Sequence, residues 1–289
     1  MLTEQSGVFA DAPYDIEWVQ MSGSNETMEA VNAGAVDVVA SVQVPAVVLA
    51  QANSTEPLTA DNAPFKVVAA WELRASKGFV LVVPTDSTAR TVADLDGHSL
   101  ALAKGAWGQY FWVKAMAAAG LAEGDVEVVM MPASEGRTAF RAGHVDALIT
   151  GHRTGLTLQD EGSGRIIASA DQYSPYMTLS LVRKGLLDDP ARAAAAADVL
   201  QRLAAEDQWI NDHPEMVAQE FITAFDLAPA TATLAARAEV RTRVPFDEQT
   251  VSLLQDVADT FLRIGTAKGP TDVSILIDDR FDQGLVRGT

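Results

Sequence analysis

Two twelve-residue stretches of the chain share one succession of apolar and polar positions. Residues 30–41 (AVNAGAVDVVAS) and 139–150 (AFRAGHVDALIT) each read as the end of a helix, a glycine, a Val-Asp pair and an apolar run. Glycine ends helices well because it adopts the left-handed conformation without a Cβ clash. The apolar run is typical of a buried strand rather than of a surface loop. Each copy therefore predicts a helix–strand junction.

The segments upstream of the two copies also correspond. A strand over 15–21, a polar turn and a helix are predicted before the first copy, and a strand over 125–131, a polar turn and a helix before the second. Unrelated αβ units can share such turn residues and helix-ending glycines by chance. The aligned small, glycine, valine and aspartate positions with matched flanks favour duplication instead. The sequence thus predicts two similarly wired α/β lobes.

The remaining pattern assigns the rest of the chain to these lobes. Further strands are predicted over 67–71, 79–83, 99–103 and 176–182, and helices over 46–51, 91–97, 190–210, 215–225 and 248–264. The strand over 176–182 is expected to return to the first lobe. We therefore expect residues 1–83 and 177–289, with the C-terminal helices, to form the first lobe and 84–176 the second. Two crossings, near Val83 and Tyr176, would form a hinge.

The repeat also bears on the start of the chain. Residues 1–7 read as a helix tail that ends at Gly7, and they match residues 115–120 of the second lobe. In that lobe a strand and a loop over 99–108 precede the helix. We expect the first lobe's first strand, its first ligand loop and any export signal to lie upstream of Met1. A lobe built without that strand is the alternative, and it would leave a costly gap in a buried parallel sheet.

Composition and charge narrow the classes of function. The chain has 289 residues, 48% of them hydrophobic, which is enough for two cores. It has no cysteine, so disulfides, thiolate metal sites and cysteine nucleophiles are excluded, and its four histidines lack metal-ligand spacing. No metal or cofactor is expected. The net charge of −18 argues against nucleic acid and anionic membranes as partners. No apolar run approaches the ~20 residues of a membrane span.

The candidate chemistry lies in polar turns between strands and helices. The chain has no nucleophile elbow, phosphate loop or dinucleotide fingerprint. Asp37 and Asp146 occupy equivalent junctions, which favours a structural role for both. Polar turns over 22–25, 104–108 and 134–136 precede predicted helices, at the sheet edge where open α/β folds bind ligands. Each turn alone is consistent with an ordinary helix cap, but three in duplicated lobes favour a cleft for a small oxyanion.

Several segments, in order and spacing, carry a resemblance to a known family. They include 16–20 (IEWVQ), 29–37 (EAVNAGAVD), 92–97 (VADLDG), 103–105 (AKG) and 139–147. Over most of residues 14–265 the chain is similar to the substrate-binding proteins of bacterial importers for sulfonates, taurine and nitrate. It resembles the aliphatic-sulfonate branch in particular.

The resemblance implies a fold and a function. The fold is the two-lobed periplasmic-binding fold of the second topological type, in which each lobe is a mixed sheet flanked by helices. The function is that of the solute-binding component of an ABC importer, which takes up a small organic sulfonate or related oxyanion without catalysis. Such a protein works in the periplasm or at the exterior of the cell envelope. It binds as a monomer between closing lobes and docks on a membrane permease.

The resemblance also places the ligand contacts. They fall on Ser22, Gly23, Ser24, Asn25, Val42, Gln43, Gly105, Ala106, Trp107 and Gly108, with His152 added as a donor. Two positions depart from the family pattern. Val44 stands where relatives carry a small hydroxyl residue, and residues 151–153 replace a Trp-Asp-Pro turn. Trp107 would form an aromatic wall of the pocket; the alternative is that it packs on Phe111 and that His152 is exposed.

Other classes of protein remain as alternatives. A small-molecule lyase or biosynthetic enzyme on the same fold is the main one. Porphobilinogen deaminase and the thiamine-pyrimidine synthases use cysteines that this chain lacks, but a lyase that uses Asn or Asp stays open. The effector domain of a regulator is disfavoured, because the chain has neither a helix-turn-helix segment nor a basic patch.

Overall fold

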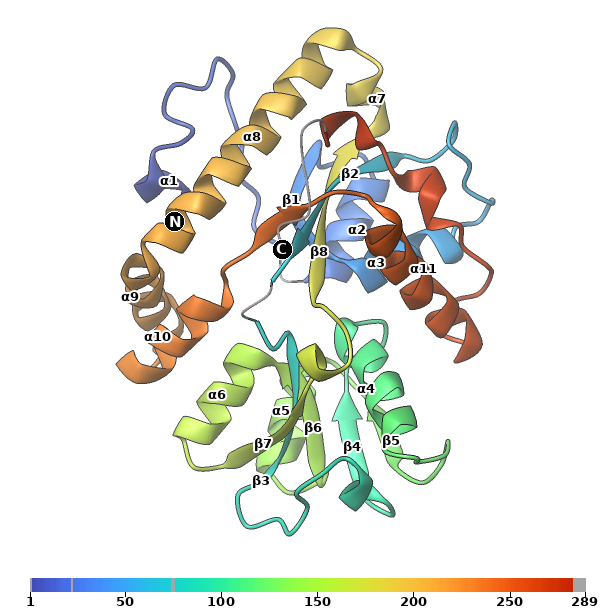
Figure 1. The fold of residues 1–289 in the computed structure, drawn as a ribbon, viewed down its shortest axis with the longest axis vertical. Helices are drawn as coiled ribbons and strands as arrows, with labels where there is room; N and C mark the ends of the chain where they lie inside the picture. The colour runs from blue at the N-terminus through green and yellow to red at the C-terminus, as the bar shows by residue number, and fades with distance from the viewer. Residues whose placement is uncertain (1, 22, 74–75, 283–289) are drawn as a thin grey trace. The chain divides into compact units, whose positions relative to one another are not determined.

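The computed structural model describes residues 2–21, 23–73 and 76–282, which form two compact units (Figure 1). Unit 1 consists of Met1–Glu72, Met177–His213 and Arg241–Thr289. Unit 2 consists of Leu73–Tyr176 and Pro214–Val240. The chain therefore changes units after Glu72, Tyr176, His213 and Val240, and not only at the two crossings expected from the sequence.

The sheet of unit 1 has the strand order β1-β8-β2-β9. These strands are β1 (Val38–Gln43), β8 (Met177–Arg183), β2 (Phe65–Glu72) and β9 (Thr242–Val244). Strand β8 runs antiparallel to both β1 and β2, so β1 and β2 are parallel to each other. The expectation that the strand over 176–182 returns to the first sheet is confirmed.

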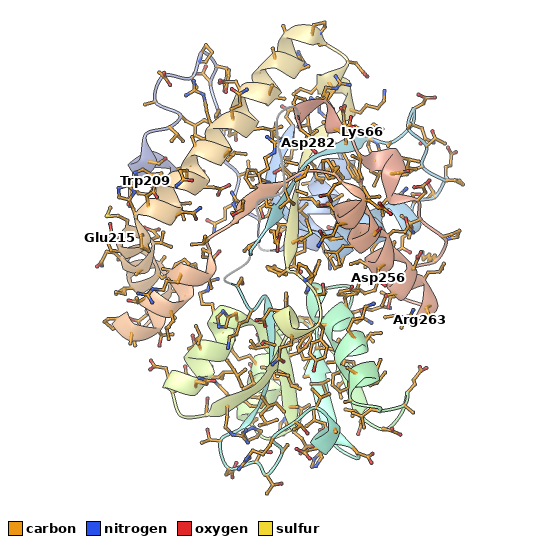
Figure 2. All side chains as sticks on the ribbon, in the orientation of Figure 1. Lys66, Trp209, Glu215, Asp256, Arg263 and Asp282 are labelled. Carbon is orange, nitrogen blue, oxygen red and sulfur yellow. The ribbon has the colours of Figure 1, made fainter. Side chains whose placement is uncertain are left out.

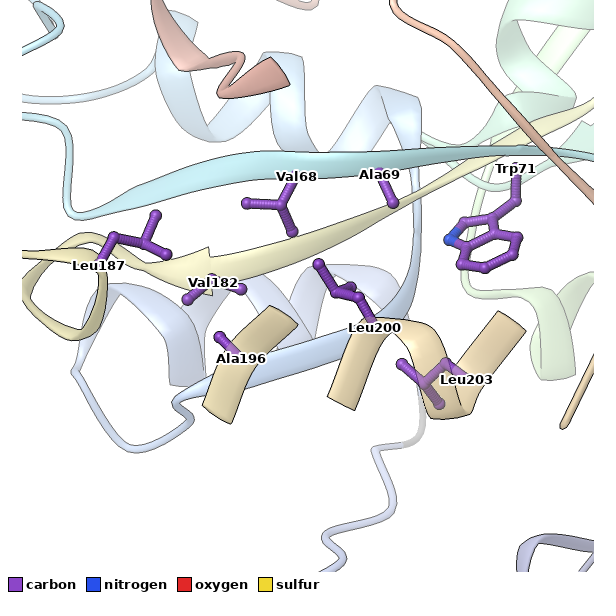
Figure 3. Packing of buried hydrophobic residues seen from close by; sticks show 8 residues of the cluster. All are labelled: Val68, Ala69, Trp71, Val182, Leu187, Ala196, Leu200 and Leu203. Atoms are coloured by element: carbon purple, nitrogen blue, oxygen red, sulfur yellow. The ribbon is translucent and has the colours of Figure 1, made fainter. Parts of the chain in front are cut away.

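The long helix α8 (Pro190–Asp212) covers one face of this sheet. Leu200 and Leu203 from α8 pack with Val68 and Trp71 of β2 and with Val182 of β8 (Figure 3). The other helical elements of unit 1 are α1 (Leu2–Ser6), α2 (Ser24–Asn32), α3 (Val44–Ala52), α7 (Lys184–Leu187), α11 (Glu248–Arg263), η3 (Val273–Leu276) and η4 (Asp279–Phe281).

Side-chain caps set the starts of α8 and α11, the helices predicted over 190–210 and 248–264. The Asp189 carboxylate accepts hydrogen bonds from the N–H groups of Ala191 and Arg192, and Pro190 occupies the first turn. The Asp247 carboxylate accepts from the Thr250 N–H, and α11 ends before Gly265, whose φ is 69°. Both starts are therefore fixed by local sequence, as expected.

The C-terminal segment packs along the β2 side of unit 1. The Lys66 ammonium donates to the Ile275 carbonyl at 2.7 Å. The Arg243 guanidinium donates to the Phe281 carbonyl at 2.8 Å and to the Asp282 carboxylate at 3.3 Å. Figure 2 labels Lys66 and Asp282. The predicted packing of this segment on the first lobe is confirmed up to Asp282.

Unit 2 contains a mixed sheet of order β5-β4-β6-β3-β7. Its strands are β5 (Glu127–Met130), β4 (Ser99–Leu102), β6 (Ala147–Gly151), β3 (Phe79–Pro84) and β7 (Gly164–Ser169). Strands β5, β4 and β6 are parallel, whereas β3 is antiparallel to β6 and β7. The helical elements are α4 (Trp107–Ala118), α5 (Ala133–Arg141), α6 (His152–Asp160), α9 (Pro214–Phe225), α10 (Pro229–Ala238), η1 (Ala93–Leu95) and η2 (Ala170–Gln172).

Two of the expected unit boundaries are wrong. Strand β3 pairs with β6 and β7 in the sheet of unit 2, so it does not close the first lobe at Val83. Helices α9 and α10 also belong to unit 2. The Arg153 guanidinium of α6 lies 5.2 Å and 4.1 Å from the ring centroids of Phe221 and Phe225 of α9. A helical pattern alone does not indicate which sheet its apolar face covers.

The repeated helix–strand junction is confirmed in atomic detail. Gly34 and Gly143 have φ angles of 70° and 69°. The Ala35 N–H donates to the Ala30 carbonyl, and the His144 N–H to the Ala139 carbonyl, each at 2.9 Å. The same helix ending therefore occurs in both units.

The strand predicted over 15–21 does not form. Its counterpart β5 pairs with β4 in unit 2, but within the described residues β1 is the edge strand of its sheet. Trp18 and Val19 are 43% and 57% exposed. A β-strand needs a neighbour for its backbone N–H and C=O groups, and the described part of unit 1 provides none here.

Candidate functional site

Three helices of unit 2 begin at the carboxyl ends of its parallel strands. Helix α4 follows β4, α5 follows β5 and α6 follows β6, so their first turns lie at one edge of the sheet. Their N-cap residues, Ala106, Pro132 and Gly151, make no side-chain capping bond. Helix α5 begins at Ala133, so the predicted turn at 134–136 is already helical. Uncapped N–H groups at this edge suit an oxyanion.

The loop from Gly105 to Gly108 has a tightly fixed backbone. Gly105 has φ of 70°, and its N–H donates to the Gln109 side-chain oxygen at 2.7 Å. Ala106 is half-buried and leads into α4. A Cβ added at Gly108 would lie 2.7 Å from Ile149 Cγ2 of β6. Only glycine at this position lets the start of α4 approach β6 so closely.

Trp107 lies inside this loop and packs within unit 2. Its side chain is fully buried, with the ring edge-on to Tyr110 at 5.4 Å and to Tyr176 at 5.3 Å between centroids. Phe111 instead contacts the ring of Tyr173, at 5.6 Å. The ring of Trp107 thus packs against Tyr110 and Tyr176, inside the same core as Phe111. In this structure Trp107 supports the loop from within the core, because its ring has no exposed face.

His152 begins α6 at the same edge. Its N–H donates to the Gly78 carbonyl at 2.9 Å, and its side chain is half-buried rather than exposed. Burial lowers the pKa of the imidazole, nearby Lys77 lowers it further, and Asp171 partly opposes them. The ring is therefore neutral at pH 7. Its Nδ1 atom is buried and has no hydrogen-bond partner among the described residues, so the ring retains capacity for another polar group.

The predicted ligand turn of unit 1 connects two elements. Gly23 is the N-cap of α2 and is exposed. The Ser24 hydroxyl accepts a hydrogen bond from the Gln43 N–H at 3.2 Å, which ties the start of α2 to the end of β1. Asn25 is exposed in the first turn. Ser22 lies outside the described residues.

Val42 and Gln43, the second pair of predicted ligand contacts in unit 1, differ in burial. The Val42 side chain is 2% exposed and belongs to the core, so only its backbone is left for a ligand. Gln43 is half-buried and is the N-cap of α3, again without a side-chain capping bond. It lies opposite Thr178 of β8, which in turn lies opposite Trp71 of β2. These three residues form a row across the carboxyl end of β1 and β2.

Sequence reasoning missed an arginine at this same edge. Arg241 directly precedes β9, whose first residue pairs with Glu72 at the end of β2. Its guanidinium lies 5.0 Å from the centroid of the Trp71 ring, and its Nε donates to the Asp207 carboxylate. Nothing in the local pattern distinguishes Arg241 from Arg243, because the aspartate comes from a helix far away in the sequence.

Unused hydrogen-bonding capacity remains on buried polar atoms of two residues that contact Arg241 and of Thr178, the strand partner of Trp71. Thr178 Oγ1, Asp207 Oδ2 and Asn211 Oδ1 are buried, with no hydrogen-bond partner in the described parts of the chain. The Asn211 amide nitrogen bonds to the Arg241 carbonyl at 3.4 Å. Burial raises the pKa of Asp207 to about 6, although the adjacent Arg241 lowers it. Buried polar groups are normally satisfied, so these atoms can bond to a water molecule or to a ligand group.

Comparison with known proteins establishes the family. Residues 1–228 match the family model described as NMT1/THI5 like. This chain belongs to the NMT1/THI5-like family. Within the described residues, no helix is both long enough and apolar enough to cross a membrane.

One protein similar in sequence and two similar in structure can be compared with this NMT1/THI5-like chain. It is 30% identical, over 132 residues, to a protein of Escherichia coli (strain K12) named as an aliphatic sulfonates-binding protein. The match spans 46% of this chain and 38% of that protein. The alkanesulfonate-binding protein SsuA from Xanthomonas axonopodis pv. citri, solved bound to MOPS, superposes with a TM-score of 0.81 at 24% identity, covering 96% of this chain and 93% of SsuA. The desulfurization enzyme DszB superposes with a TM-score of 0.67 at 13% identity, covering 97% and 93%.

These likenesses fix the fold. The expected architecture, two mixed sheets flanked by helices in the manner of SsuA, is confirmed. The curated relative is a binding protein, whereas DszB shows that the same fold also occurs in an enzyme.

Proposed function

We propose that this chain is the solute-binding component of an ABC importer and that it binds a small organic sulfonate or related oxyanion. The observation that carries the proposal is the set of uncapped helix starts at the carboxyl ends of β4, β5 and β6. They present backbone N–H donors without a fixed positive side chain. An anion can therefore be held by a protein whose net charge is −18.

The proposed ligand contacts lie on both units. In unit 2 they are the backbone of residues 105–108 and the side chain of His152. In unit 1 they are the start of α2 at residues 23–25 and the end of β1 at Gln43. A ligand that engages both units would favour a closed arrangement over an open one, which is the proposed mechanism of hinge closure.

Relatives support the assignment of substrate and partner. The curated relative is named for aliphatic sulfonates, and SsuA was solved with MOPS, which is itself a sulfonate. We further propose that the protein acts outside the cytoplasmic membrane, as a monomer that delivers its ligand to a membrane permease.

A thermal-shift panel tests the proposal. It compares taurine, longer alkanesulfonates, an aromatic sulfonate, sulfate, nitrate and a thiamine pyrimidine. A ligand at one hundred times its dissociation constant stabilises the folded state by about 2.7 kcal/mol, which is readily measured as a raised Tm. A shift with sulfonates supports the proposal. A cooperative melt that no oxyanion moves contradicts it.

The likeness to DszB makes an enzyme the second candidate. We propose binding without turnover, because the described edges show no nucleophile paired with a base. Incubating the protein with any ligand found in the panel, followed by mass spectrometry of the small molecule, distinguishes the two. Unchanged ligand supports a binding protein. More moles of product than moles of protein show catalysis.

A further inference from the structure

We infer that Arg241 is the cationic contact for the ligand's oxyanion in unit 1, an inference that rests on the proposed function. The residue does not belong to any of the polar turns singled out from the sequence. It lies at the same edge as Gln43, because β1 and β2 are parallel and β9 begins where β2 ends. The edge of unit 1 would then offer a guanidinium in addition to backbone amides.

The guanidinium is held in place from two sides. The Trp71 ring lies beneath it, with 5.0 Å from the guanidinium carbon to the ring centroid. Asp207 of α8 accepts from Nε, the nitrogen nearest the backbone. The indole is itself fixed, since its N–H donates to the Ser180 hydroxyl at 2.7 Å. An arginine held in this way loses little side-chain entropy when it binds an anion.

The two terminal nitrogens of Arg241 remain for another acceptor. Within the described residues, the hydrogen bonding of this guanidinium is through Nε alone. Its side chain is 16% exposed, so it is shielded from bulk water but still reachable. Two parallel N–H groups in a plane match two oxygens of a sulfonate or carboxylate, which gives both strength and orientation.

Arg243, two residues further on, shows what a purely structural arginine looks like in this unit. One of its terminal nitrogens donates to the Phe281 carbonyl at 2.8 Å and to the Asp282 carboxylate at 3.3 Å. It thus fixes the C-terminal segment on β2. Among the described residues, the Arg241 side chain bonds to Asp207 and to no second group, although it lies closer to the ligand edge.

The unused polar atoms beside Arg241 strengthen the inference. Thr178 is 6% exposed and its hydroxyl has no partner among the described residues. Thr178 lies between Gln43 and Trp71 in the row across the three strands. It is therefore next to Trp71, the ring on which the Arg241 guanidinium packs. A hydroxyl donor and a guanidinium at one edge suit a ligand group with several acceptor oxygens. We therefore assign the ligand class as a tetrahedral oxyanion, a sulfonate in preference to a neutral sulfone.

The test uses the full chain and the alkanesulfonate that gives the largest thermal shift. Removing Arg241 alone would leave Asp207 buried and unpaired, which destabilises folded proteins. The binding variant is therefore D207N/R241Q, which removes both charges. The matched control is R183Q, since Arg183 also pairs with an aspartate, Asp37, but at the opposite end of β8. Affinities are measured by isothermal titration calorimetry for the sulfonate and for the methyl sulfone of the same chain length.

The inference predicts that D207N/R241Q melts cooperatively and binds the sulfonate about ten- to a hundredfold more weakly than the unmodified protein. It also predicts that the preference for sulfonate over sulfone shrinks by a similar factor, while R183Q changes neither. A folded D207N/R241Q variant with unchanged sulfonate affinity overturns the role of Arg241 and leaves the proposed function standing. An unmodified protein that binds no oxyanion of the panel overturns both.

Discussion

The carboxylate of Asp146 accepts hydrogen bonds from both the N–H and the hydroxyl of Ser99, at 2.8 and 2.7 Å. The Asp146 N–H donates back to the Ser99 hydroxyl at 3.0 Å. The pair joins the start of β6 to the start of β4. The equivalent residue of the repeat, Asp37, instead forms an ion pair with Arg183 at the end of β8. Both aspartates are therefore structural, as the repeat predicted.

Replacing Asp146 tests this role. Asp146→Ala removes two accepted hydrogen bonds, and we expect a loss of about 1–2 kcal/mol in the free energy of unfolding, measured by urea denaturation. Asp37→Ala is the comparison, because an exposed ion pair contributes at most about 1 kcal/mol. An Asp146 variant no less stable than the Asp37 variant would contradict the structural assignment.

Gly108 provides a second prediction, at the start of α4. An added Cβ would lie 2.7 Å from Ile149 Cγ2 and 2.9 Å from Phe79 Cδ1. We expect Gly108→Ala to cost about 1–3 kcal/mol by overpacking and to weaken ligand binding by displacing the loop. Gly151→Ala is a matched control at the neighbouring helix start, where no atom lies within 4 Å of the added Cβ. Chemical denaturation and calorimetry on both variants check the prediction, and equal behaviour of the two would refute it.

The buried carboxyl of Asp207 predicts the direction in which its contribution to the free energy of unfolding changes with pH. Its folded pKa is raised from 3.8 to about 6, so the folded state binds the proton more tightly than the unfolded state. Between about pH 4 and 6, the contribution of Asp207 to stability should therefore fall as the pH rises, by roughly 1.4 kcal/mol for each unit of pKa shift. The measurement is the difference in unfolding free energy between the unmodified protein and Asp207→Asn across this range. A difference that is flat with pH would contradict the raised pKa.

Substitution of Asn25 should change ligand affinity without changing stability. It is exposed in the first turn of α2, so Asn25→Ala should leave the Tm within about a degree, as expected for a surface substitution. If residues 22–25 contact the ligand, the same variant should bind about tenfold more weakly, which corresponds to one lost hydrogen bond. Unchanged affinity would remove this turn from the site.

Local signals in the sequence determined much of the fold. Gly34 and Gly143 mark the ends of two helices because few other residues tolerate a positive φ. Asp189 and Asp247 mark helix starts because their carboxylates accept N–H groups within one turn. Such features depend on a few neighbouring residues, so a single sequence is enough to predict them.

Features that depend on distant partners were not predictable in this way. The apolar pattern of residues 15–21 is that of a strand, but a strand also requires a neighbour. The placement of the Arg241 guanidinium depends on Asp207 and Trp71, which come from other parts of the chain. The burial of Trp107 likewise depends on Tyr110 and Tyr176, which its position in the loop does not indicate.

Whether this chain binds a small sulfonate is best decided by calorimetric titration of the purified protein with an alkanesulfonate series. We expect one ligand per chain and an affinity that depends on the charged group, with the matching neutral sulfones bound far more weakly. A folded protein that releases no binding heat with any sulfonate and shows no Tm shift with them would contradict it.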